Sequence, residues 1–335
     1  MDPSVELDPL NPPKSDRARH GEKRGECAKS NDRFSEAAEA NVALQQLLKG
    51  RENLLETLPA VPAILQSLLE ELNLPADKVD MPRVAELICR DESLAAHCLR
   101  MANSPLFGRV KSTNSIRAAI RTIGIARVRD IALSCKLMRI GDTQRGLDPV
   151  VFWEHSLGCA ILSRKLARSA GFENPDKAYL AGLLHDIGYI VNFMLVPREM
   201  KRALAEAARE HVFAGEVEYA TLGFTHCQSG EILANKWHFS PDLVEVIRCH
   251  HNPAAAVVNP ALTAIVALSD RVCRSLTLGL GYVESPDPGN AWQEDWNVLT
   301  RACPLAAQMT WEDFVKDSES YFVEIHELVK NMFNA

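Results

Sequence analysis

The stretch Leu58-Pro-Ala-Val-Pro-Ala-Ile-Leu-Gln-Ser-Leu-Leu-Glu-Glu-Leu72 shows the pattern that most of the chain follows. After two prolines, its apolar residues are spaced i, i+1, i+4, i+5 and i+8: Ile64, Leu65, Leu68, Leu69 and Leu72. This spacing is typical of a helix that buries one face. The stretch therefore predicts a short amphipathic helix.

Similar segments with clear start and stop signals follow along the chain. Asp80 and Pro82 indicate a helix start, and Asp91 opens another helix that ends near Asn103. A helix over residues 115–123 should stop at Gly124. Further helices are expected over residues 149–170, 176–188, 197–210, 215–237, 241–250 and 260–276, then a Gly/Pro-rich loop over 279–290 and two C-terminal helices. The fold class expected is all-α, a multi-helix bundle.

The composition excludes several classes of protein. Of the 335 residues, 47% are hydrophobic and 24% charged, which excludes disorder throughout the chain. No uninterrupted apolar run reaches about 18 residues, and the acidic N-terminus lacks an apolar segment, so we expect neither a membrane span nor a secretory signal. The nine cysteines contain no C-x-x-C pair, which favours a reducing cytoplasm over a disulfide framework or a zinc ribbon.

The charge distribution is uneven. The net charge is −7, yet the segment from Arg100 to Ile140 contains nine basic residues and one acidic residue. A positive face of this kind fits an acidic partner, a nucleotide or RNA, and its candidate contacts are Arg109, Arg117, Arg121, Arg127 and Arg129. The alternative is that acidic neighbours such as Glu70, Glu71 and Glu86 neutralise the segment in the fold.

Several short motifs, in this order and spacing, resemble the HDOD domain family. They are Leu58-Pro-Ala-Val-Pro62, Arg90-Asp-Glu-Ser-Leu-Ala95, Leu99-Arg-Met-Ala-Asn-Ser104, Phe107-Gly108, Ile116-Arg-Ala-Ala-Ile120 and Ile123-Gly124. The resemblance implies a bacterial cytoplasmic signalling or regulatory module that acts by binding. It also implies a helical subdomain over residues 54–145 and an HD-like core over 146–260. We expect residues 261–335 to complete that core and residues 1–40 to form a flexible polar tail.

Histidines and acidic residues spread over about 115 residues indicate a metal site. The candidates are His155, His185, Asp186, His226, His250, His251 and Asp270. Imidazole and carboxylate suit Fe, Mn, Zn or Co, and a carboxylate can bridge two ions. Cys159, Cys227 and Cys249 lie near these residues in sequence, but cysteine is a common core residue and packing is the favoured role.

The order of these residues resembles the metal ligands of the HD superfamily. By that resemblance His155, His185, Asp186 and Asp270 form a single-metal site. The remaining histidines, with Asp186 bridging, resemble the additional ligands of two-metal HD-GYP proteins. Two departures argue against cyclic-di-GMP hydrolysis: Tyr189 stands where the HD-x-G-K motif has lysine, and no Gly-Tyr-Pro segment follows His251.

Two functional hypotheses remain open, with no catalytic residue assigned. The first is a regulatory module that binds a signalling protein or a nucleotide, with a metal that ties distant helices together. The second is a metal-dependent phosphohydrolase, whose substrate charge would be met by Arg248, Arg271 or the basic segment.

Overall fold

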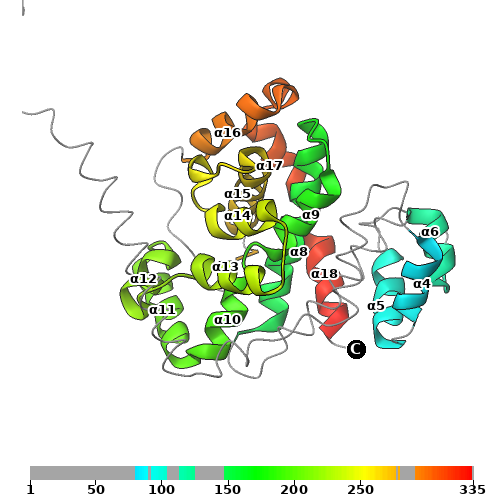
Figure 1. Ribbon diagram of the computed structural model, residues 1–335, viewed down its shortest axis with the longest axis horizontal. Helices are drawn as coiled ribbons and strands as arrows, with labels where there is room; N and C mark the ends of the chain where they lie inside the picture. Colours follow the sequence, from blue (N-terminus) through cyan, green and yellow to red (C-terminus); the bar gives the residue numbers. More distant parts are fainter. Residues whose placement is uncertain are drawn as a thin grey trace, which may run out of the picture. The chain divides into compact units, whose positions relative to one another are not determined.

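The computed structural model describes residues 80–89, 92–103, 113–124, 147–276, 278–279 and 291–333. The described residues all belong to one unit, Ala40–Ala335. They form helices connected by turns, with no strand among them (Figure 1). The all-α prediction is confirmed. The expected tail over 1–40, the helix over 58–72 and most of the loop over 279–290 lie outside the described residues.

Three short helices form the first group: α4 (Met81–Cys89), α5 (Glu92–Ala102) and α6 (Ile116–Ile123). They pack against one another through Val84, Ile88, Cys98, Ala102, Ile116 and Ile120. The Ser115 side chain caps α6, and Gly124 ends it with a φ of 88°, as the sequence predicts.

A buried helix, α8 (Pro149–Ser169), lies at the centre of the second group of helices. It packs against α9 (Pro175–Leu184), α15 (Pro260–Ser275) and α18 (Phe322–Phe333) (Figure 1). Fourteen of its 21 residues are buried, so polar side chains on it, including that of His155, lie in the core. The Asp148 carboxylate caps the helix by accepting from the backbone N–H of Val150.

Further helices surround α8, α9 and α15. α10 (Ile187–Leu195) packs on α13 (His226–Lys236), α11 (Pro197–Glu210) on α12 (Ala214–Leu222), and α14 (Pro241–Cys249) on α13 and α15. At the C-terminal end, α16 (Ala291–Ala302) packs on α15, and α17 (Trp311–Glu319) precedes α18; short 3-10 turns occupy Pro253–Ala255 and Pro304–Gln308. Proline occupies the first turn of α8, α9, α11, α14 and α15, where its missing N–H costs no hydrogen bond.

Three of the expected helices differ from the structure. The predicted helix over 176–188 ends at Leu184, and a separate helix, α10, begins at Ile187. The predicted helix over 215–237 is interrupted after Leu222, where Gly223 adopts a φ of 76°. The C-terminal part contains three α-helices rather than two. Apolar residues flank both of the first two breaks, and only the second carries a stop signal in the sequence, Gly223.

The segment Pro175–Leu195 is long and apolar enough by composition to cross a membrane. In the fold, however, it consists of α9, a turn and α10, and 94% of its apolar window is buried inside the protein. Packing in the core therefore accounts for its hydropathy.

Candidate metal centre

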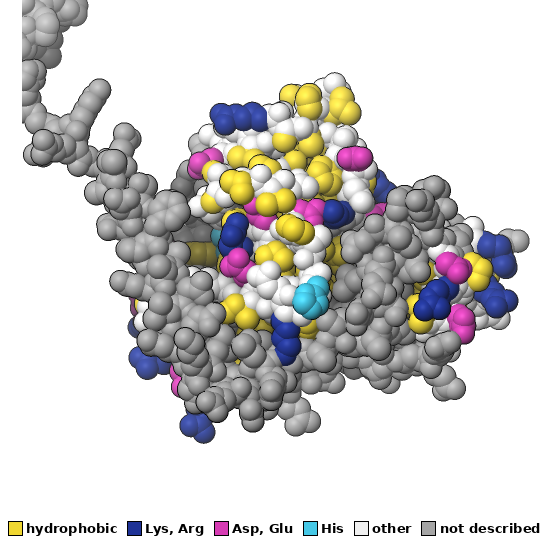
Figure 2. Space-filling model, in the orientation of Figure 1, with side chains coloured by type: hydrophobic (Ala, Val, Ile, Leu, Met, Phe, Trp, Pro, Cys, Tyr) yellow, Lys and Arg dark blue, Asp and Glu magenta, His cyan; other side chains and the backbone are white. Residues whose placement is uncertain are grey.

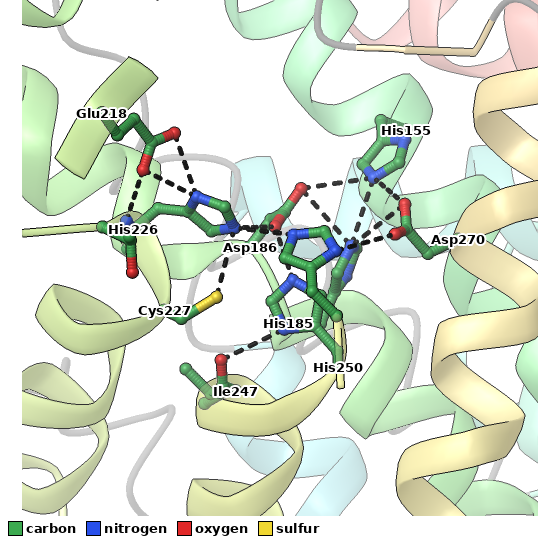
Figure 3. A network of polar contacts seen from close by, with 12 residues as sticks. His155, His185, Asp186, Glu218, His226, Cys227, Ile247, His250 and Asp270 are labelled. Atoms are coloured by element: carbon green, nitrogen blue, oxygen red, sulfur yellow. Dashed lines mark hydrogen bonds and ion pairs between the residues drawn. The ribbon is translucent and has the colours of Figure 1, made fainter. Parts of the chain in front are cut away.

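Helices and the turns between them bring six of the seven predicted ligand residues together in Figure 3, and His251 lies beside them with its Nδ1 atom 3.8 Å from Asp270 Oδ2. His155 lies in α8 and Asp270 in α15, while His185 and Asp186 occupy the turn between α9 and α10. His226 is the first residue of α13, and His250 and His251 follow the last residue of α14. Each break in a helix thus frees a ligand side chain to face a common centre.

Four of these residues form a first group. His155 Nε2 lies 3.3 Å from Asp186 Oδ2 and 3.2 Å from Asp270 Oδ1. His185 Nε2 lies 3.3 Å from the same Asp186 oxygen and 3.8 Å from the same Asp270 oxygen. The ligand atoms of His155, His185 and Asp270 lie within 4.8 Å of one another, and Asp186 forms an adjoining group with His185 and His250.

The other three histidines form a second group, in which His226 and His250 face the second Asp186 oxygen and His251 Nδ1 lies 3.8 Å from Asp270 Oδ2. His226 Nε2 lies 3.4 Å and His250 Nε2 3.3 Å from Asp186 Oδ1. His251 Nε2 lies 3.1 Å from His226 Nε2. The two oxygens of Asp186 are consequently divided between the two groups, which is the geometry of a bridging carboxylate.

The outer nitrogens of the imidazoles fix their orientation. His155 Nδ1–H donates to the Leu278 carbonyl at 2.6 Å, and His185 Nδ1–H to the Gly182 carbonyl at 2.7 Å. His250 Nδ1–H donates to the Ile247 carbonyl at 3.1 Å. Because a carbonyl oxygen only accepts, each of these Nδ1 atoms carries the proton and Nε2 is the atom that faces the centre.

Glu218 plays the same part for His226. Its carboxylate accepts from His226 Nδ1 at 2.9 Å and from the His226 backbone N–H at 2.6 Å, and its side chain is fully buried. A carboxylate behind a histidine raises the basicity of the facing nitrogen and is a common partner of metal-binding histidines. Sequence analysis did not identify Glu218.

The donor set fits a positive ion. The Asp186 Oδ1 and His250 Nε2 atoms are buried and have no hydrogen-bond partner. Two pairs of Nε2 atoms face each other, His155 with His185 at 3.2 Å and His226 with His251 at 3.1 Å. His155 and His185 both hold their protons on Nδ1, so their facing Nε2 atoms need a further proton or an ion between them.

The pKa values of the histidine and aspartate side chains also indicate that the centre is stabilised by positive charge. Burial by itself lowers the pKa of His155, but hydrogen bonds to Asp186 and Asp270 outweigh it and raise the pKa to about 10. Burial raises the pKa of the two carboxyl groups, but the neighbouring His185 and Arg274 cations outweigh it and hold both pKa values well below their usual range. In the protein without an ion, protons on some histidines supply the charge that the carboxylates need.

The centre has a narrow opening with room for about one water molecule. Its lining residues are His155, Asp186, Tyr189, His251, Asp270, Arg274 and Gly279. Arg274 Nη2 lies 2.8 Å from Asp270 Oδ2, one helical turn along α15. The Tyr189 ring is 1% exposed and stacks on His226, with 4.2 Å between ring centroids.

The family follows from a comparison with known domains. A model of the HDOD domain matches residues 58–253, more than half of the chain. The chain belongs to the HDOD domain family. A solved HDOD domain protein of unknown function from Geobacter sulfurreducens is 29% identical, with a TM-score of 0.74 over 85% of this chain and 99% of that one.

More distant relatives share the fold of this HDOD protein. A structure from Shewanella amazonensis SB2B, provisionally named a phosphohydrolase, is 22% identical with a TM-score of 0.65, covering 85% of this chain and 97% of that one. An uncharacterized protein of Treponema pallidum is 23% identical over 241 residues, which is 69% of this chain and 45% of that protein. This HDOD protein thus spans less than half the length of the curated relatives it matches.

The arginines proposed to meet a substrate charge lie elsewhere. Arg271 Nε donates to Asp295 at 2.7 Å, and Arg248 lies 3.6 Å from Glu231. Arg274, which the sequence analysis did not single out, is the arginine at the opening. Arg274 could have been found from the sequence, because it lies four residues after Asp270 on the same predicted helix and therefore next to it.

Proposed function

We propose that this HDOD protein is a regulatory module built around a two-metal centre, and that it acts by binding a partner. The division of the two Asp186 oxygens between two groups of histidines carries the proposal. The first ion would be held by His155, His185, Asp186 and Asp270, and the second by Asp186, His226, His250 and His251. This donor set suits Fe, Mn or Zn.

Metal binding here couples to folding because the ligands come from distant segments. The two groups join α8, α13, α15, the turn before α10 and the segment after α14. A bound ion supplies positive charge to a buried, acidic cluster and lowers the pKa of any water it holds. The surrounding residues orient the imidazoles, because backbone carbonyls and the Glu218 carboxylate accept hydrogen bonds from their Nδ1 atoms.

Two observations favour binding over catalysis. Tyr189, at the position of the lysine in catalytic HD-GYP domains, packs its ring against His226 and carries no positive charge. The opening among the described residues has room for about one water molecule, so at most a small group could enter the centre there. The metal centre would then stabilise one arrangement of helices for recognition by a partner.

The partner surface is proposed to include the basic face that begins on the first group of helices. Arg83, Arg100, Arg117 and Arg121 are exposed there, and Figure 2 shows basic side chains over this group with acidic ones, among them exposed Glu86, between them. Arg109, Arg127 and Arg129 lie outside the described residues. A signalling protein with an acidic surface, a nucleotide or RNA fits such a face, in a bacterial cytoplasm that keeps the cysteines reduced.

The test of this proposal combines metal content with an activity screen. Protein purified without chelator should contain two ions per chain, and the metal-loaded form should not hydrolyse generic phosphomonoesters or phosphodiesters. Hydrolysis that is lost in Asp186→Asn would overturn the binding role and support catalysis. Binding of a nucleotide or RNA at the basic face should weaken steeply with salt and in Arg121→Glu.

A metal-dependent phosphohydrolase is the second candidate, and Arg274 is the observation that favours it. Its guanidinium lies at the opening, where a substrate phosphate would approach the ions. If the protein hydrolyses phosphoesters, Arg274→Met should lower kcat/KM by about 10- to 100-fold, the effect of a lost charge-assisted hydrogen bond. Arg271→Met is the matched control, because Arg271 pairs with Asp295 instead.

A further inference from the structure

A thiol joins the second group of histidines. Cys227 follows His226 directly in the first turn of α13, and its Sγ atom lies 3.5 Å from His226 Nε2. Figure 3 shows the thiol beside the inner nitrogen of His226 rather than its outer one. The ligand atoms of Cys227, His226, His250 and His251 all lie within 4.8 Å of one another.

An independent observation marks this point as a ligand position. His250 Nε2 is buried and makes no hydrogen bond, although Asp186 Oδ1 lies 3.3 Å away, and it belongs to the same group of ligand atoms as the Cys227 sulfur. His226 Nδ1–H is engaged by the Glu218 carboxylate, which leaves Nε2 to accept from the Cys227 S–H or to bind an ion. Two imidazole nitrogens and a sulfur therefore face one small space.

We propose that Cys227 is a ligand of the second metal ion. The inference rests on the proposed two-metal centre and deepens it by specifying the class of metal. A thiolate beside three imidazoles is a soft donor set, so the second site should prefer Zn²⁺, Co²⁺ or Fe²⁺ to Mg²⁺ or Mn²⁺. Binding forms a metal–sulfur bond and releases the thiol proton to solvent.

The other cysteines near the centre are engaged differently. Cys249 Sγ accepts from Arg248 Nε at 3.4 Å, although Cys249 precedes His250 directly. Cys159 Sγ donates to the Val266 carbonyl at 3.8 Å. Neither belongs to a group of residues able to hold an ion in the described part of the chain. Cys249→Ser is therefore a matched control for Cys227→Ser.

The experiment loads metal-free protein with Co²⁺ and records its absorption spectrum. Wild type and Cys249→Ser should show a near-ultraviolet sulfur-to-cobalt charge-transfer band, and Cys227→Ser should lack it while keeping the visible cobalt bands. The preference for Zn²⁺ over Mn²⁺ in competition should fall at least about tenfold in Cys227→Ser. A charge-transfer band of equal strength in Cys227→Ser would overturn the assignment.

A second measurement uses the wild-type chain alone. Zn²⁺ loading should protect Cys227, which is partly exposed, from alkylation, as measured by mass spectrometry of its peptide. Equal alkylation of Cys227 with and without bound Zn²⁺ would contradict the inference. If two ions bind but Cys227 is neither protected nor spectroscopically visible, only this inference fails. If no ion binds, the two-metal centre itself fails.

Discussion

Replacing Asp186 by asparagine removes the carboxylate whose two oxygens face two histidines of the first group and two of the second. Asparagine has almost the same volume, so the change leaves no cavity and isolates the loss of charge. The two Asp186 oxygens lie 3.3–3.4 Å from four imidazole nitrogens. The variant should therefore bind at most one ion per chain, and that ion more weakly.

The size of the effect follows from ligand linkage. An ion present at 100 times its dissociation constant stabilises the folded state by about 2.7 kcal/mol. For a unit of about 300 residues, with an unfolding entropy of about 2.1 cal/mol/K per residue, that free energy corresponds to about 4 °C in melting temperature. Wild type should show this difference between metal-loaded and chelator-treated samples, and Asp186→Asn should show almost none. The chelator-treated variant should also melt below chelator-treated wild type, because the protonated histidines lose a buried counter-ion.

Differential scanning calorimetry with and without chelator is the assay. Asp317→Asn is the control, since Asp317 is 72% exposed and pairs with Lys165 at 3.5 Å. That change should alter the free energy of unfolding by less than about 0.5 kcal/mol. A metal-dependent shift in Asp186→Asn equal to that of wild type would refute the bridging role.

Three further predictions concern the surroundings of the centre. Glu218→Gln should weaken binding of the second ion by about 10- to 100-fold, measured by calorimetric titration with Zn²⁺; unchanged affinity would mean that Glu218 does not tune His226. Gly188→Ala should lower the free energy of unfolding by about 1–3 kcal/mol, because the added methyl group would collide with the His226 carbonyl where α10 packs on α13. An unchanged midpoint of urea unfolding would contradict the close approach of Gly188 to this carbonyl. The stabilisation by metal should grow as pH rises from 6.5 towards 10. The raised pKa of His155 stabilises the metal-free protein fully below pH 6.5, and this stabilisation is lost as pH rises through about 10, where the ion no longer competes with the proton. Melting temperatures measured with and without metal from pH 6 to 9 would refute this if the difference between them narrowed.

The helices could be predicted from local sequence signals, and the seven residues of the candidate metal centre could be predicted from the order of a family motif. Proline at the first turn and glycine after the last turn are read directly, as Gly124 illustrates. The order of histidines and aspartates in the family motif predicted seven candidate ligands, and the structure places all seven around one centre. Whether they bind a metal stays a prediction.

The breaks that expose the ligands could not be predicted from periodicity. Residues on both sides of His185 and Asp186 are apolar and buried, so the turn between α9 and α10 looks like a continuous helix in the sequence. The turn forms because the two polar side chains face a centre that other helices build. That centre is a tertiary property, which local propensity does not record.

Residues that support the ligands were missed for a related reason. Glu218 carries no motif, and its pairing with His226 is known only once the fold is known, whereas Arg274 lies four residues after the predicted ligand Asp270 on one helix. Glu218 did leave a signal, since it lies on the buried side of α12 with Ala214 and Gly215. A carboxylate among residues that face the core is expected to have a specific partner.

Elemental analysis of protein purified without chelator tests the central claim most directly. The account predicts two transition-metal ions per chain in wild type and at most one in Asp186→Asn. An absence of bound metal in wild type, even after incubation with Zn²⁺, Fe²⁺ or Mn²⁺, would contradict it, as would an unchanged metal content in the variant.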